Sequence, residues 1–85
     1  MAWKLVLAKH ALRALDRLPA SEQQHIRETL EKLRSDPGSV DLAKLSGPRA
    51  RWRVRVGPLR IIVGMSNIDG TIYVLDVIQR KDAYR

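Results

Sequence analysis

The chain has 85 residues, of which 16 are Lys or Arg and nine are Asp or Glu, so its net charge is +7. It has no cysteine, which excludes a disulfide framework and a thiolate zinc site. Its longest apolar runs are far shorter than the roughly 18 residues of a membrane-spanning helix, so we expect a soluble cytoplasmic protein with no membrane partner. We also expect a single domain over residues 1–85, whose charge attracts a polyanion or an acidic protein.

The first half of the chain is predicted to form one strand and two helices. Trp3–Leu7 is a short apolar run with an aromatic and a β-branched residue, as is typical of strands. From Lys9 the apolar residues recur at steps of three and four, which predicts an amphipathic helix that ends at Pro19. A second helix is expected after Pro19, with Glu22 well placed for the helix dipole. The apolar faces of the two helices are Ala8, Ala11, Leu12, Leu15 and Leu18, and then Ile26, Leu30 and Leu33.

Turn-forming residues at 35–39 are predicted to end the helical half. Residues 40–47 are interpreted as a packed connector, because the spacing of Leu42 and Leu45 allows one helical turn. Strands are then expected at 51–56, 60–65 and 71–79, separated by hairpin-type turns at 57–58 and 67–70. The fold class is therefore α+β, with an N-terminal strand, an antiparallel two-helix hairpin and a three-stranded antiparallel meander. The helices should pack on one face of a small sheet.

Arginines alternate with apolar residues along the predicted strands, and alternate side chains of a strand point to opposite faces. The positions expected to face the helices are Trp52, Val54, Val56, Ile61, Val63, Met65, Tyr73, Leu75 and Val77. Asp76 and Ile78 should then lie on the uncovered face, together with four arginines from three strands: Arg53, Arg55, Arg60 and Arg80. Neighbouring strands lie about 5 Å apart, so this arrangement favours a site for one or two RNA phosphates. A solvated face of ordinary arginines would show the same alternation.

Four other residues have positions or side chains that could give them a particular role. Tyr84 lies in a polar segment, where it could stack on a base or orient a ribose hydroxyl, or form an aromatic lid over the sheet edge. His10 and His25 are expected on the helices, on the far side of the sheet from the arginines, and are not assigned to catalysis. Gly64 within a strand indicates a bulge or a close approach of another backbone segment, rather than a phosphate-binding loop.

Three stretches of this sequence, Lys44–Gly47, Trp52–Ile62 and Ile72–Arg85, closely resemble the RelE branch of the RelE/ParE toxin superfamily. The resemblance extends over essentially the whole chain, including the predicted order of strands and helices. It implies a toxin of a type II toxin-antitoxin pair that cleaves messenger RNA in the ribosomal A site. It also implies a cognate antitoxin that wraps the toxin and keeps it inactive.

The resemblance also implies which residues act. Matched by position, the family's catalytic residues fall on Arg53, Arg55, Arg60, Arg80 and Tyr84. We expect Arg51, Lys81 and Arg85 to bind RNA. The best-known family pattern has lysines at positions 53 and 55, and arginine is a poor general base because its pKa exceeds about 12. The expected reaction is attack of the ribose 2′-hydroxyl on the adjacent phosphate, without a metal ion or another cofactor.

Two alternatives to a ribosome-dependent endoribonuclease remain at this point. The same superfamily includes ParE-like toxins that inhibit DNA gyrase, and a fold alone does not separate the two activities. The chain could also be a nuclease-inactive domain whose arginines only bind RNA or an antitoxin. For every alternative that involves an antitoxin, we expect a partner with an acidic segment and a hetero-oligomeric complex, since such a segment would neutralise the arginines.

Overall fold

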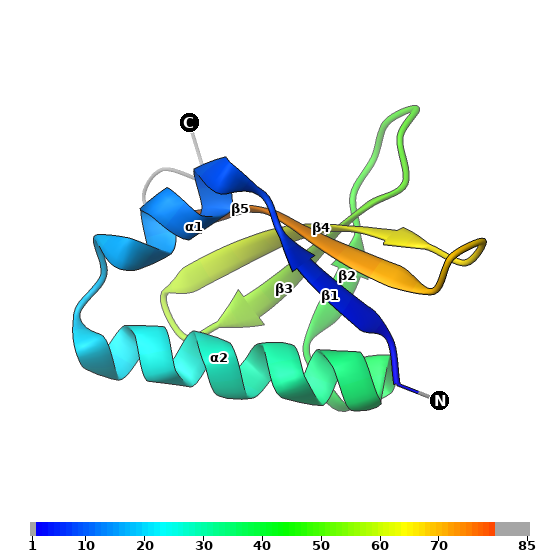
Figure 1. The fold of residues 1–85 in the computed structure, drawn as a ribbon. Helices are drawn as coiled ribbons and strands as arrows, with labels where there is room; N and C mark the ends of the chain where they lie inside the picture. Colours follow the sequence, from blue (N-terminus) through cyan, green and yellow to red (C-terminus); the bar gives the residue numbers. More distant parts are fainter. Residues whose placement is uncertain (1, 80–85) are drawn as a thin grey trace.

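The computed structural model describes residues 2–79 of the chain (Figure 1). Its elements, in chain order, are β1 (Lys4–Leu7), α1 (Lys9–Asp16), α2 (Ala20–Ser35), the 3-10 turn η1 (Pro37–Ser39), β2 (Leu42–Lys44), β3 (Arg51–Val56), β4 (Leu59–Ser66) and β5 (Thr71–Gln79). None of the helices in this part of the chain is long and apolar enough to cross a membrane.

The strands form one mixed sheet of five strands in the order β1-β5-β4-β3-β2. The expected antiparallel meander is present as β3, β4 and β5, but it is only the centre of the sheet. β1 pairs in parallel with β5, and β2 pairs in antiparallel fashion with β3. The prediction of a three-stranded meander therefore understated the sheet.

The interpretation of residues 40–47 as a connector with a helical turn was wrong. The turn lies earlier, at η1, where the side chain of Asp36 accepts a hydrogen bond from the amide of Gly38 at 3.1 Å. Residues Leu42–Lys44 instead pair with β3, Leu42 opposite Val54 and Lys44 opposite Trp52. Three residues are too few for a clear strand signal, and a leucine pair three residues apart suits a helical turn as well as a short strand.

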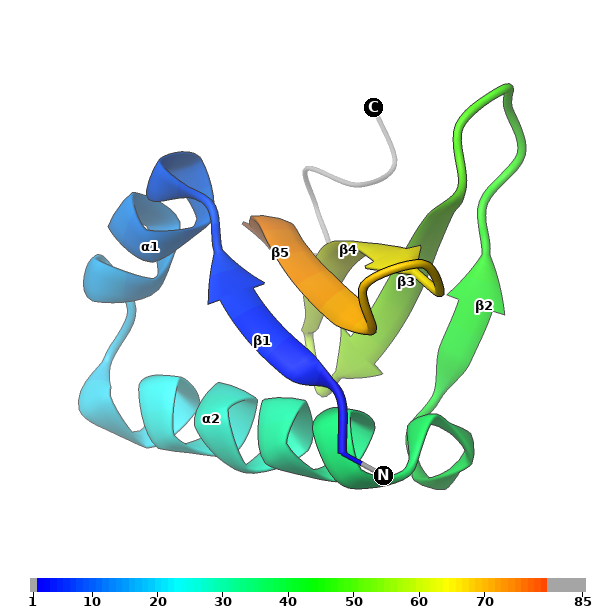
Figure 2. The same ribbon diagram turned by 45° about the vertical axis from the view of Figure 1, so that its right-hand side comes forward.

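The two helices begin at or next to the expected residues, at Lys9 and at Ala20 directly after Pro19. α2 lies across one face of the sheet, while α1 packs against β5 beyond the residues that pair with β1 (Figures 1 and 2). Ala11 and Leu15 are buried as expected, but Leu12 is 47% exposed. The apolar face predicted for the first helix was therefore too wide.

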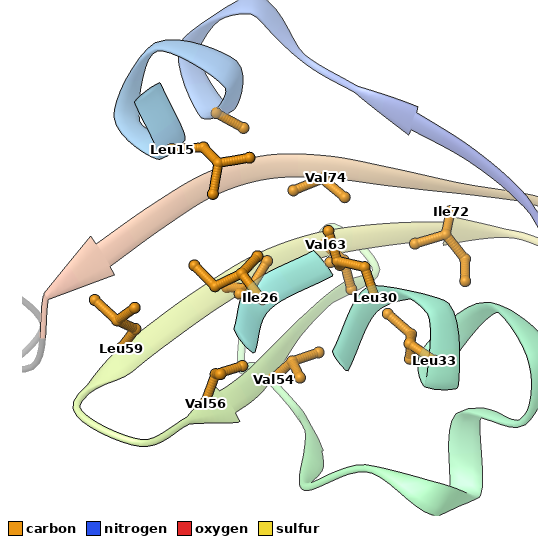
Figure 3. Packing of buried hydrophobic residues seen from close by; sticks show 12 residues of the cluster. Leu15, Ile26, Leu30, Leu33, Val54, Val56, Leu59, Val63, Ile72 and Val74 are labelled. Atoms are coloured by element: carbon orange, nitrogen blue, oxygen red, sulfur yellow. The ribbon is translucent and has the colours of Figure 1, made fainter. Parts of the chain in front are cut away.

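The core lies between α2 and the inner face of the sheet (Figure 3). Ile26, Leu30 and Leu33 of α2 are all buried, which confirms the stripe predicted for the second helix. Full burial of side chains of this size stabilises a fold by about 1.5–3 kcal/mol each. The buried cluster comprises Ala11, Leu15, Ile26, Leu30, Leu33, Val54, Val56, Leu59, Ile61, Val63, Ile72 and Val74.

A bulge in β5 changes the side-chain alternation within that strand. Ile62 pairs with Asp76 and Val63 pairs with Val74, so Leu75 is the extra residue. Before the bulge, Ile72 and Val74 face the core; after it, Val77 packs against the core. The prediction that Tyr73 and Leu75 face the helices was therefore wrong, whereas that for Val77 is confirmed.

Candidate nucleic-acid interface

The sheet face opposite α2 carries four arginines, Arg51, Arg53 and Arg55 of β3 and Arg60 of β4, which we call the arginine face. Val54 and Val56 are buried in the core, so the arginines that alternate with them along β3 lie on the other side of the sheet. In the ladder between β3 and β4, Arg53 pairs with Ile62 and Arg55 pairs with Arg60. The predicted placement of Arg53, Arg55 and Arg60 on one face of the sheet is therefore confirmed, while their roles stay a prediction.

Arg60 is on the expected strand but is not open to solvent. Its exposed fraction is only 4%, and its Nη1 donates hydrogen bonds to the carbonyl oxygens of Leu59 at 3.0 Å and Gly57 at 3.3 Å. The expectation of an accessible Arg60 is corrected by this geometry, because the guanidinium turns toward the β3–β4 turn. Gly57 has a φ of +57°, as a two-residue hairpin turn with glycine at its first position requires.

A buried guanidinium opposite a second arginine is electrostatically unfavourable. Directly opposed side chains in a sheet lie about 5 Å apart, and like charges there are destabilising. Two backbone carbonyls accept hydrogen bonds from Arg60, yet a guanidinium has five N–H donors. The Arg55–Arg60 pair is therefore suited to hold an anion.

Asp41, which directly precedes β2, approaches two arginines of this face. Its carboxylate oxygens lie 3.9 Å from Nη2 of Arg53 and 3.7 Å from Nε of Arg55. Nη1 of Arg53 is buried and has no hydrogen-bond partner among residues 2–79. A buried donor without a partner is uncommon in native structures, and a ligand oxygen that reached it would satisfy it.

Gly64 leaves space for the side chain of Arg51. A Cβ at Gly64 would lie only 3.2 Å from Nη1 of Arg51 and 3.7 Å from Cδ1 of Leu75. The group that approaches this glycine most closely is a side chain, whereas a bulge or a backbone approach was expected. The absence of a side chain lets the Arg51 guanidinium lie over β4.

Tyr73 lies on the arginine-face side of the sheet with 38% of its surface exposed, although it was expected to face the helices. It pairs with Gly64, and its hydroxyl donates to Oδ2 of Asp69 at 3.2 Å. The hydrogen bond from Ser66 is the main cause that lowers the pKa of Asp69; desolvation opposes it, and hydrogen bonds from Thr71 and Tyr73 lower the pKa further. An exposed aromatic ring beside arginines is suited to stack on a nucleobase.

His10 and Asp76 form a second polar pair at the β5 side of this face. Nε2 of His10 lies 3.1 Å from Oδ1 of Asp76, and the same oxygen accepts the backbone amide of Val77 at 2.8 Å. His10 was expected on the far side of the sheet, and this was wrong because α1 lies beside β5 rather than under the sheet. No sequence signal linked the two residues, which are 66 positions apart (76 minus 10).

The remaining residues predicted to act are Arg80, Lys81, Tyr84 and Arg85, and they lie outside the described residues. Within residues 2–79, no group of three or more His, Asp or Glu side chains is arranged to hold a metal ion. A separate apolar groove lies between β1 and the helices and is lined by Leu5, Leu7, Leu12, Leu15, Arg27, Leu30 and Glu31.

No protein-family model matches the chain. Comparison with individual proteins and solved structures nevertheless finds relatives that agree with one another. A protein of Methanocaldococcus jannaschii that bears the name RelE1 is 27% identical over 88 residues, which span 100% of this chain and 98% of that protein. The chain also resembles a chain of the RelE-RelB complex of Pyrococcus horikoshii, with 26% identity, a TM-score of 0.82 and coverage of 94% and 97%. A chain of the RelBE2 toxin-antitoxin complex of Mycobacterium tuberculosis has the same fold, with a TM-score of 0.83, 22% identity and coverage of 94% and 100%.

Proposed function

We propose that this chain, which belongs to the RelE family of toxins from toxin-antitoxin systems, is an endoribonuclease that cleaves messenger RNA on the ribosome and thereby inhibits translation. The observation that supports this most directly is the opposition of Arg55 and Arg60 across β3 and β4. Like charges at directly opposed positions are unfavourable, and a backbone phosphate bound by the exposed Arg55 beside Arg60 would offset that repulsion. An RNA strand supplies phosphates at regular intervals along the whole face.

The proposed reaction uses a nucleophile that the substrate itself carries. The ribose 2′-oxygen attacks the adjacent phosphorus, the bond from phosphorus to the 5′-oxygen breaks, and the products are a 2′,3′-cyclic phosphate and a 5′-hydroxyl. The proposal assigns no step to a metal ion or cofactor. The protein must position the attacking oxygen in line with the leaving oxygen and stabilise the charge that develops on the phosphate.

The arginines divide this work according to their exposure. Arg53 and Arg55 are partly or largely accessible, with side-chain exposures of 25% and 51%, so they would bind the phosphate on arrival. Arg60 is buried, and its charge is therefore screened less by water and salt, which favours transition-state stabilisation. Arg51 would bind a flanking phosphate.

Residues beyond position 79 complete the proposal. Arg80 would assist the leaving oxygen and Tyr84 would orient the substrate, while Lys81 and Arg85 would add phosphate contacts. The ribosome would supply the alignment of the message in the A site, so cleavage of free RNA should be slow. These assignments place the protein in the cytoplasm, where translation occurs.

The proposed protein partner is an antitoxin with an acidic segment. The arginine face attracts negative charge, and the groove beside β1 offers apolar surface, including Leu12 with 47% exposure. An antitoxin that covers both surfaces would block RNA access and form a toxin-antitoxin hetero-oligomer. Co-expression with candidate acidic antitoxins, followed by affinity purification, tests whether such a complex forms and suppresses cleavage.

The purified protein should be added to a translating extract, and the 5′ ends of a defined mRNA should be mapped by primer extension. We expect cuts within A-site codons when ribosomes translate, and none in ribosome-free RNA. Arg53→Ala should abolish the cuts, whereas the matched control Arg27→Ala, on the exposed side of α2, should retain them. Intact mRNA with inhibited DNA supercoiling by gyrase would instead support a ParE-like activity, and loss of neither function would indicate a domain that only binds.

A further inference from the structure

None of the four arginines of the arginine face can accept the proton of the 2′-hydroxyl, and the one carboxylate beside them in residues 2–79, that of Asp41, is engaged with Arg53 and Arg55. Arginine stays protonated throughout the accessible pH range, so Arg51, Arg53, Arg55 and Arg60 cannot act as general bases. Imidazole is the side chain best suited to that role near neutral pH. Of the two histidines, His10 is the one that lies at the β5 side of the arginine face, in contact with Asp76.

A row of paired residues connects the arginine face to His10. Arg53 of β3 pairs with Ile62 of β4, and Ile62 pairs with Asp76 of β5, so the three residues lie side by side across the sheet. Two strand spacings separate Arg53 from Asp76, which is a backbone distance of about 10 Å. Because Leu75 is the extra residue of the bulge, Asp76 lies on the same face of the sheet as Ile62 and Tyr73. Val77, the next residue, still packs against the core.

Asp76 is held in place and in turn holds His10. Its Oδ1 accepts the amide of Val77 at 2.8 Å and lies 3.1 Å from Nε2 of His10. In the neutral imidazole, this contact places the proton on Nε2 and leaves Nδ1 as an acceptor. The His10 side chain is 75% exposed, so a substrate hydroxyl can reach it. A carboxylate that orients a histidine and stabilises its protonated form is a recurrent arrangement for general bases.

We propose that His10 is the general base of the cleavage reaction and that Asp76 is its positioning residue. Nδ1 of His10 takes the proton of the 2′-hydroxyl as the 2′-oxygen forms its bond to phosphorus. The electron pair of the breaking bond goes to the 5′-oxygen, which is protonated by solvent, and the imidazolium later returns its proton to water. This inference depends on the proposed function, because it assigns a role within that reaction.

The test is single-turnover cleavage of an mRNA in ribosome complexes stalled with one defined A-site codon. His10→Gln should lower the rate of cleavage by about 100-fold or more, the contribution usual for a general base. Asp76→Asn should cause a smaller loss, because the amide still accepts a hydrogen bond but does not stabilise an imidazolium. His25→Gln, an exposed histidine on α2, is the matched control and should cleave at the unaltered rate.

Two further readouts separate catalysis from a structural role. The wild-type rate should rise with pH through the neutral range where imidazole loses its proton, and this rise should be absent in His10→Gln. Asp76 faces His10 from β5, while Lys9 and Arg13 are its charged neighbours on α1. Binding of an RNA oligonucleotide and the thermal unfolding midpoint should be the same in His10→Gln and wild type.

The outcomes distinguish this inference from the proposed function. If the wild-type protein fails to cut mRNA on translating ribosomes, the proposed function itself is overturned. If the wild type cleaves and His10→Gln cleaves at the same rate with the same pH profile, only the role of His10 is overturned. A loss of cleavage that accompanies a matching loss of RNA binding would also contradict a general base.

Discussion

Asp41 contacts Arg55 through both its backbone and its side chain. Its carbonyl oxygen accepts a hydrogen bond from the Arg55 amide at 3.0 Å, and its Oδ2 lies 3.7 Å from the Arg55 Nε. The second carboxylate oxygen lies 3.9 Å from Nη2 of Arg53. One negative group is thus shared between two arginines, where a phosphate oxygen of RNA would be expected to bind.

Replacement of this carboxylate should strengthen RNA binding. Asp41→Asn keeps the backbone contact to Arg55 but removes the charge that competes with phosphate. The pair is largely exposed, so we expect about a two- to fivefold gain in affinity for a short RNA at low salt. Glu28→Gln makes the same change of charge on exposed α2 and should have a smaller effect. Fluorescence anisotropy measures both, and weaker binding by Asp41→Asn would mean that Asp41 mainly orders the arginines.

Arg60 should be more important for activity than for stability. Its guanidinium is buried and satisfied only in part, and an apolar side chain of similar length avoids that cost. We therefore expect Arg60→Met to unfold at the wild-type temperature or above it, while ribosome-dependent cleavage is lost. Calorimetry and primer extension measure the two properties. A variant that melts many degrees lower but still cleaves would show that Arg60 is structural.

Tyr73 is expected to contribute a stacking surface for RNA. Tyr73→Ala should weaken binding of an RNA oligonucleotide by about 1 kcal/mol or more, as loss of one base–aromatic stack does. Tyr73→Phe keeps the ring and should bind like the wild type, although it loses the hydrogen bond to Asp69. Equal losses in both variants would indicate that the hydroxyl, rather than the ring, is what matters.

The stability that Asp69 contributes in the turn between β4 and β5 should depend on pH. Its pKa in the folded protein is lowered, mainly by the Ser66 hydrogen bond, so Asp69 stabilises the fold in its charged form. This stabilisation is complete above the pKa of the unfolded chain and is lost as the pH falls through the folded pKa. Denaturant unfolding of wild type and Asp69→Asn should therefore differ at pH 7 and converge under strongly acidic conditions. A difference that is constant with pH would exclude a role for the charge.

Much of the fold follows from local sequence patterns. The stripe of Ile26, Leu30 and Leu33 was predictable because helical spacing alone defines it, and the alternation of valine with arginine defined both faces of β3. β2 was not predictable, since three residues gain strand geometry only from the neighbour they pair with. Local propensity contains no information about such a partner.

The site was predictable only where alternation is regular. The bulge at Leu75 reverses the faces of β5, so counting by twos placed Tyr73 in the core. The alternation of side chains also assigned Arg60 to a face of the sheet. It could not predict that Arg60 is buried, because this burial depends on the carbonyls of the adjacent turn. The contact of His10 with Asp76 arises from the position of α1 beside β5, which is a tertiary property.

The parallel pairing of β1 with β5 has a consequence for synthesis. Lys4 pairs with Thr71 and Leu7 with Val74, so the first strand has no partner until residue 74 has been made. Chains grow from the N-terminus, and contacts between distant residues form late in folding. A nascent chain shorter than this cannot complete its sheet or align β5 beside the arginines. We therefore expect incomplete chains to be inactive. The ribosome that makes the protein will have translated nearly all of this sequence before the molecule can act.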